Sequence, residues 1–171
     1  MSYTIHIRKR LHEELDKMSS VNLKDYYERH ADNREWLEII SKFPEGLQRE
    51  IAVEREDVER EDIEQFRNYN LQGNSPITVN LGAVLKNNLE SLERVPQEVL
   101  DVINKKWGTK ARTVTVYDQD PDRYFRYSEM KSNTAKPSVM VDGEIIWGVG
   151  RFIASLVRGD KSIAVWDLRS N

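Results

Sequence analysis

The spacing of apolar positions predicts a mainly helical first part of the chain. Between about residues 11 and 66, apolar residues recur at helical spacing in several short pieces. Asn33 is a suitable N-cap for one of these helices, and Pro44 ends or kinks it. Before them, apolar and polar residues alternate at residues 3–7, which predicts one short strand.

The pattern changes to a mixture of strands and helices in the second part. An apolar run at residues 77–81 predicts a strand, and the helical spacing that follows extends to residue 92. Pro96 is well placed in the first turn of a further helix, and Gly108 is placed to end it. Residues 112–117 alternate in the manner of a half-buried strand.

The last third of the chain has the clearest local signals. Asp142-Gly143 lies between two apolar runs and indicates a tight hairpin, because a type I′ turn needs positive φ at both central positions. The residues from Gly148 to Arg151 then turn the chain into a short helix, and residues 161–168 read as a closing strand.

Charge divides the chain at about the same place as the pattern. The formal net charge is −3, but residues 1–70 hold 12 basic and 17 acidic residues, whereas residues 71–171 hold 14 and 12. Between them, residues 68–76 collect Gly, Pro and three Asn without apolar periodicity. We therefore expect an acidic helical region at residues 1–73 and a mixed α/β domain at residues 74–171.

Composition excludes several classes of protein. The chain has no Cys, which excludes disulfides, cysteine-zinc clusters, iron–sulfur centres and thiol nucleophiles. The charge balance excludes a uniformly basic nucleic-acid coat. No apolar run approaches the roughly 18 residues of a membrane span, and the N-terminus has no apolar signal region. We expect a cytoplasmic protein without a membrane partner.

The corner formed by Gly148, Gly150 and Arg151 is the first candidate binding site. Glycines let backbone N–H groups approach a ligand, a helix N-terminus adds partial positive charge, and an arginine binds phosphate bidentately. A nucleotide or nucleic-acid phosphate would suit this corner. The structural alternative is that the glycines only make a tight turn, which the arginine covers.

The polar loop at residues 118–131 is the second candidate. Asp118, Asp120 and Asp122 alternate there and are the candidate ligands of a Mg²⁺ ion beside a nucleotide. The same loop interleaves cations with aromatic rings, a composition that suits contacts with bases and phosphates. These candidate contacts are Arg123, Tyr124, Arg126 and Lys131. The alternative is a loop packed on the core by its aromatic residues, with its arginines paired to the aspartates.

Residues 54–62 carry eight charges in nine positions. Their mixed signs favour a solvated helix face with pairs at spacing i,i+4, such as Glu56 with Arg60. The alternative is that the acidic segment 50–64 docks a host protein.

The order of hairpin, glycine turn, helix and strand over residues 110–168 resembles the ParB/sulfiredoxin-like superfamily, and residues 76–109 match its preceding strand and helices more loosely. Gly148 and Arg151 match the first and last positions of the family's turn, and Asp142-Gly143 matches its hairpin. Val149 and Gly150 stand where the family has polar residues, which removes candidate acid, base or metal-binding groups. The lack of cysteine removes sulfiredoxin chemistry.

The resemblance implies an α+β fold, in which a small mixed sheet has flanking helices and follows an acidic, mainly helical extension. It further implies a nucleotide- or nucleic-acid-phosphate-binding protein of phage or plasmid type, with weak or no catalysis. A nucleoside triphosphate with Mg²⁺ is the cofactor it suggests, and a nucleotide or DNA the partner. The alternatives are a protein-interaction module or inhibitor of a host complex, and a metal-dependent nuclease or NTPase.

Overall fold

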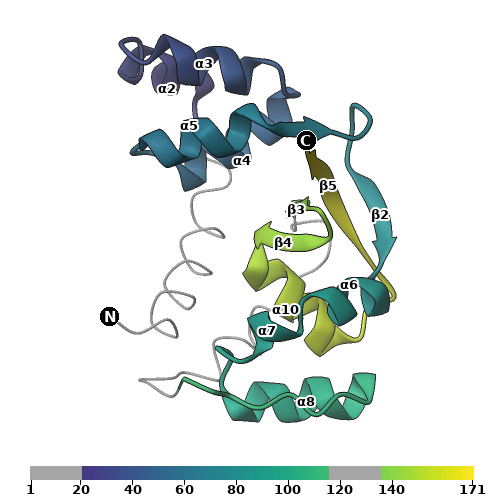
Figure 1. Ribbon diagram of the computed structural model, residues 1–171. Helices are drawn as coiled ribbons and strands as arrows, with labels where there is room; N and C mark the ends of the chain where they lie inside the picture. Colours follow the sequence, from purple (N-terminus) through teal and green to yellow (C-terminus); the bar gives the residue numbers. More distant parts are fainter. Residues whose placement is uncertain (1–20, 116–135) are drawn as a thin grey trace.

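The computed structural model describes residues 21–115 and 136–171. The expected strand at residues 3–7 lies outside them. The described chain is a mixed α+β structure, in which a small mixed sheet lies between two groups of helices (Figure 1). This confirms the fold class expected from the sequence at the level of its architecture.

The long C-terminal strand β5 organises the sheet. It pairs in parallel with β3 on one edge, and β3 pairs with β4 through the antiparallel hairpin. The other edge of β5 is shared by two short antiparallel strands, β2 along its first half and β1 along its end. The strands are β1 (Tyr69–Leu71), β2 (Ile77–Asn80), β3 (Ser138–Val141), β4 (Glu144–Trp147) and β5 (Ser162–Ser170).

Helices cover both faces of this sheet. The helices α2 to α5 lie above it in Figure 1, and α6, α7, α8 and α10 lie below it. Their bounds are α2 (Leu23–Arg29), α3 (Arg34–Ser41), α4 (Glu45–Glu54), α5 (Arg60–Arg67), α6 (Leu81–Asn87), α7 (Leu89–Leu92), α8 (Gln97–Trp107) and α10 (Val149–Arg158). Each helix layer buries its own apolar cluster against the sheet.

Strand alternation supplies both clusters from the same strands. In β3, Met140 packs with the lower helices, whereas its neighbours Val139 and Val141 pack with the upper ones. A register shift in the β3–β4 pairing places Trp147 opposite Val139. This bulge turns Trp147 to the upper side, where its ring stacks on Phe66 at 5.3 Å between centroids.

The upper cluster joins the two parts into which the sequence divides. It combines side chains of α2 to α5 with side chains of β3, β4 and β5. The expected linker at residues 68–76 also contains strand β1, which pairs with the end of β5. The change in composition near residue 73 is therefore not a change of core, because residues on both sides pack together.

Most of the local expectations are confirmed. Asn33 caps α3 by accepting from the Trp36 N–H at 3.3 Å, and Gly108 ends α8 with φ +69°. Asp142 and Gly143 have φ +49° and +88°, as a type I′ turn requires. The Asp142 carboxylate also accepts from the hydroxyl and the N–H of Ser170, and these bonds lower its pKa.

Two local expectations are wrong. The charged run at residues 54–62 is not one helix face, because residues 55–59 connect α4 to α5. Residues 112–115 are not a strand. Instead, the Thr113 N–H donates to the Gln97 side chain and the Val114 N–H to the Glu93 carbonyl. These contacts hold the segment against the α7–α8 region rather than in the sheet.

A fragment of residues 74–171 should not fold into the native structure by itself. Without α2 to α5, it would expose Val139, Trp147, Trp166 and Leu168, which are at most 6% exposed in the full chain. We expect the fragment to have a weaker near-ultraviolet circular dichroism signal than the full chain. We also expect it to bind more of a fluorescent dye that recognises exposed apolar surface. A cooperative unfolding transition of the fragment would instead show that residue 73 is a true domain boundary.

Candidate functional site

The corner at Gly148 is built as the sequence suggests. Gly148 follows β4 with φ +77° and is the N-cap of α10. Its carbonyl accepts from the Ser138 hydroxyl at 3.0 Å and from the Phe152 N–H at 3.1 Å. No described side chain caps the ten-residue helix at this end. The first turn of α10 therefore begins directly at the glycine.

Arg151, the candidate phosphate ligand, is held in a buried ion pair with Glu50 of α4. Both side chains are only 5% exposed. The guanidinium Nη1 and Nη2 donate to the two carboxylate oxygens at 3.0 and 3.2 Å, and Nη1 also donates to the Lys136 carbonyl at 2.9 Å. This bidentate geometry is the one that makes a buried arginine–carboxylate pair favourable.

The absence of a side chain at Gly148 makes room for this pair. A Cβ atom there would lie 2.6 Å from Ser138 Oγ, 2.8 Å from Arg151 Nη2 and 3.0 Å from Arg151 Nε. Within the described chain, Arg151 Nε has no hydrogen-bond acceptor. Gly148 is therefore required both for its positive φ and for the space that the guanidinium occupies.

The ion pair changes what the glycine corner can do. A phosphate at the start of α10 would reach the terminal nitrogens of Arg151 only by displacing Glu50. That carboxylate would then be buried without its partner, which is strongly unfavourable. Phosphate binding by Gly148, Gly150 and Arg151 stays a prediction, and the contacts seen in the structure join α10 to α4.

Several candidate residues lie outside the described residues. These are the three carboxylates Asp118, Asp120 and Asp122 and the four proposed nucleic-acid contacts Arg123, Tyr124, Arg126 and Lys131. Across residues 21–115 and 136–171, no group of three or more His, Cys, Asp or Glu side chains could hold a metal ion. In the same residues, no helix has the length and apolar character needed to span a membrane.

The acidic segment 50–64 divides into buried and exposed members. Glu50 pairs with Arg151, and Asp62 is buried with one oxygen 2.7 Å from Arg55 Nε. By contrast, Asp57, Glu59 and Glu61 are exposed and form no salt bridge with a described residue. Only the exposed members of segment 50–64 are available to a partner.

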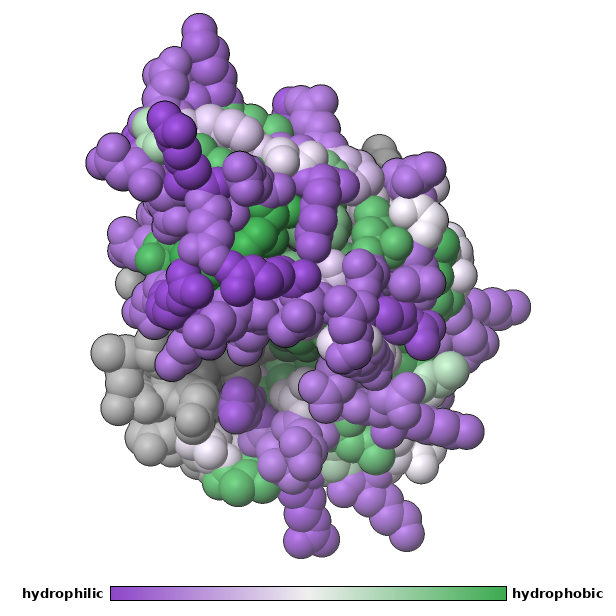
Figure 2. Space-filling view, turned by 45° about the horizontal axis from the view of Figure 1, so that its top comes forward, coloured by the Kyte–Doolittle hydropathy of each residue, from purple (hydrophilic) through white to green (hydrophobic). Residues whose placement is uncertain are grey.

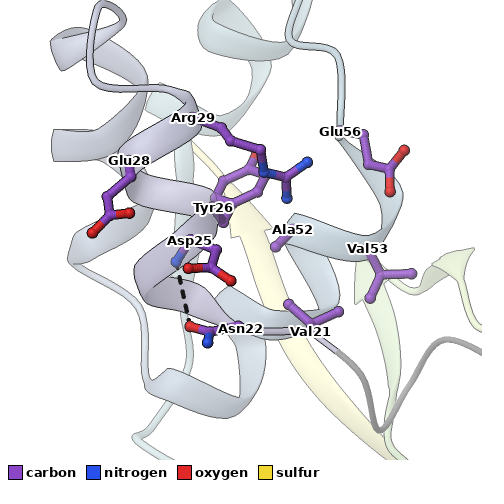
Figure 3. Close-up of a pocket in the computed structure, with 9 residues that line it drawn as sticks. All are labelled: Val21, Asn22, Asp25, Tyr26, Glu28, Arg29, Ala52, Val53 and Glu56. Carbon is purple, nitrogen blue, oxygen red and sulfur yellow. Dashed lines mark hydrogen bonds between the residues drawn. The ribbon is translucent and has the colours of Figure 1, made fainter.

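The exposed acids border two adjoining hollows. One, of about 560 Å³, follows the α4–α5 connection and is lined mainly by acidic side chains. The other, of about 610 Å³, lies between α2 and α4 (Figure 3). Val53 and Glu56 line both. We call Asp25, Glu56, Asp57, Glu59 and Glu61 the acidic face. Figure 2 shows hydrophilic residues gathered over this end, with apolar patches between them.

The larger hollow has an apolar wall and a fixed floor. Ala52 and Val53 of α4 face α2 across it in Figure 3. The Tyr26 hydroxyl donates to the Arg55 carbonyl at 2.6 Å and accepts from Trp36 Nε1 at 3.0 Å. Burial raises the pKa of this hydroxyl. Tyr26 therefore serves as a neutral, hydrogen-bonded support below the hollow.

The sequence interpretation missed Glu50 as the partner of Arg151. The two residues are 101 positions apart, so no local pattern connects them. One signal was present: Glu50 shares the buried face of α4 with Leu47 and Ile51. A carboxylate on an apolar helix face indicates a buried cation, although it does not say which one.

Comparison with protein-family models, with curated proteins and with solved structures finds no match to this chain. The ParB/sulfiredoxin-like assignment therefore stays a prediction that rests on the sequence motifs and on the mixed α+β architecture.

Replacing Arg151 with Met should destabilise the fold by about 3–5 kcal/mol, because it leaves Glu50 buried without a cation. The double variant Glu50→Leu/Arg151→Met should regain part of that loss, since no unpaired charge remains. Urea unfolding followed by circular dichroism measures both effects.

Arg49→Met is the matched control, because Arg49 pairs with Glu45 while the two side chains are 47% and 68% exposed. It should change stability by at most about 0.5 kcal/mol. An equally small effect of Arg151→Met would contradict the structural role and leave Arg151 available to an anion.

Gly148→Ala should destabilise the protein more than Gly108→Ala does. Both positions have positive φ, so both variants lose about 1–2 kcal/mol to backbone strain. A Cβ at Gly108 meets nothing within 4 Å, whereas one at Gly148 meets Ser138 and Arg151. Overpacking should add about 1–3 kcal/mol at Gly148 alone. Equal losses in urea unfolding would show that the guanidinium can move away without penalty.

Proposed function

We propose that the protein is a protein-interaction module whose acidic face binds a partner with a basic, partly apolar surface. The observation that carries this proposal is the row of exposed acids without salt bridges to described residues, Asp57, Glu59 and Glu61, beside the hollow between α2 and α4. Exposed charges of one sign attract a complementary surface and orient its approach.

The chemistry of the larger hollow favours lysine and arginine side chains. Their aliphatic stems can pack on apolar surface while the charged ends stay near water and carboxylates. Ala52 and Val53 supply that surface, and Asp25 and Glu56 lie among the lining residues. Arg29 also lines the hollow, with its guanidinium 5.8 Å from the centroid of the Tyr26 ring. It provides one cation that a partner's acidic residue could meet.

Phosphate binding at the glycine corner is the second candidate. The described start of α10, a ten-residue helix without a side-chain cap, supports it, because first-turn N–H groups attract anions. It requires Glu50 to give up Arg151. If this site operates, Glu50→Gln should strengthen the binding of nucleotides. Nothing observed among the described residues supports the alternative of a metal-dependent nuclease or NTPase.

Neutralising the acidic face should weaken the binding of a basic peptide. We expect the variant Asp57→Asn/Glu59→Gln/Glu61→Gln to lose about tenfold in affinity for a labelled peptide rich in lysine and leucine, as exposed charge pairs each contribute about 0.2–1 kcal/mol. Fluorescence anisotropy at several salt concentrations measures it, and the wild-type affinity should fall as salt rises.

The control variant neutralises three exposed acids near α7 and α8, Glu90→Gln/Glu93→Gln/Glu98→Gln. It removes the same net charge and should retain the wild-type affinity. If both triple variants weaken binding equally, the peptide responds to net charge alone, and the acidic face is not a docking surface.

A further inference from the structure

We propose that a hollow at the C-terminal end of α8 binds single-stranded nucleic acid, with one base against Trp107 and the adjoining phosphates on lysines. The hollow measures about 490 Å³, within the range of sites that hold small molecules or one unit of a polymer. It belongs to the lower helix layer and is separate from both the acidic face and the glycine corner.

Three segments meet at this hollow. The junction of β2 and α6 contributes Gly82, the end of α8 contributes Lys106 and Trp107, and the turn between α10 and β5 contributes Gly159 and Lys161. A Cβ at Gly159 would lie 3.6 Å from Lys106 Cδ and 3.8 Å from its Nζ. The Lys106 side chain therefore lies over the turn that also carries Lys161.

The hollow has positive charge that no described residue pairs with. Lys106 and Lys161 are exposed, and neither side chain forms an ion pair or hydrogen bond with another described residue. The one carboxylate lining the described hollow, Asp160, is held by Arg158 at 2.9 Å. Lysines that share a hollow without a compensating acid are a suitable place for an anion.

Two further exposed lysines lie close to the end of α8 in the chain. Lys105 and Lys110 are also exposed and also have no ion-pair partner in the part of the chain that the structure describes. Four such lysines near one helix end offer more than a single phosphate needs. Proteins that bind single strands track the phosphate backbone with cations in this way.

Trp107 provides the surface for a base. Its Nε1–H donates to the Leu156 carbonyl at 2.9 Å, so its polar atom is already satisfied inside the protein. The half-buried ring packs on the lower apolar cluster, and a Cβ at Gly82 would approach it to 3.6 Å. What the ring offers to the hollow is hydrocarbon surface held in a fixed orientation. A base can stack on such a ring whatever its identity.

The combination favours a nucleic acid strand over an anion without a base. An acidic peptide or inorganic phosphate would use the lysines but leave the indole ring exposed. A strand uses both. The hollow does not depend on the proposed docking of a basic partner, because the acidic face is built from the other helix layer.

Fluorescence anisotropy with a labelled oligothymidylate tests this site in the full chain. Lys106→Gln/Lys161→Gln should weaken binding about tenfold or more at low salt. It should also reduce the slope of log K against log salt by about 1.4, since each phosphate contact on a single strand contributes about 0.7. An unchanged slope would overturn the assignment, and so would a wild-type protein that does not bind the strand at low salt.

The matched control, Lys24→Gln/Arg34→Gln, removes two exposed cations from α2 and α3. It should leave both affinity and slope unchanged. A loss equal to that of the lysine pair would mean that the strand responds to overall charge, which would also overturn the proposal.

Stacking is tested separately from charge. Trp107→Leu should weaken the strand about tenfold or more without altering the salt slope, whereas Trp107→Phe should keep most of the affinity. If circular dichroism shows that Trp107→Leu is unfolded, the proposal is tested by Trp107→Phe and by Lys106→Gln/Lys161→Gln.

Two competitors complete the test. If tripolyphosphate displaces the labelled strand with the same potency as an unlabelled oligothymidylate, that result would contradict base stacking. If free thymidine triphosphate binds as tightly as the strand, that result would contradict the proposal that the hollow binds a strand rather than a single nucleotide. Weak competition by both compounds is the expected result. Failure of these measurements leaves the basic-peptide experiment on the acidic face unaffected.

Discussion

The buried pair of Glu50 and Arg151 is the contact on which the arrangement of the molecule depends. It joins α4 in the upper helix layer to α10, which packs against the lower face of the sheet. A pair that is 5% exposed has lost its hydration, so only complete hydrogen bonding makes it favourable. The bidentate contact, the Lys136 carbonyl and the space at Gly148 meet that requirement together. Moving α4 relative to α10 would break both guanidinium–carboxylate bonds at once.

The same pair explains why two functional interpretations of the sequence interfere with each other. A local pattern of glycines and arginine at a helix start indicates an anion site, and a run of acids indicates a docking surface. Both interpretations assume that the charged side chains face solvent. Folding brings one charge from each pattern together in the interior, so Arg151 is occupied and Glu50 is hidden. Asp57, Glu59 and Glu61 remain exposed to a partner. The sequence alone could not distinguish them from the buried Glu50 and Asp62.

How far the fold could be predicted follows from the range of the interactions involved. The Asp142-Gly143 hairpin, the Asn33 cap and the Gly108 helix end are set by neighbouring residues, and the sequence predicts all three. Strand β1 exists because the edge of β5 is available to it, although its own segment has the composition of a linker. Residues 112–115 have the alternation of a strand but find hydrogen bonds near α7 and α8 instead. The partner of Arg151 is likewise set by tertiary structure, across 101 residues.

The net charge of −3 conceals two surfaces of opposite sign on one framework. The acidic face belongs to the upper helices, whereas lysines without an ion-pair partner in the described part of the chain lie near the end of α8 in the lower layer. The sheet and its two apolar clusters lie between them, and exposed charges act over only about 8 Å at physiological salt. An acid on one surface therefore does little to weaken an anion bound at the other. A sequence with near-neutral charge can in this way attract a cationic partner and an anionic one at the same time, provided that the buried ion pair keeps the two layers together.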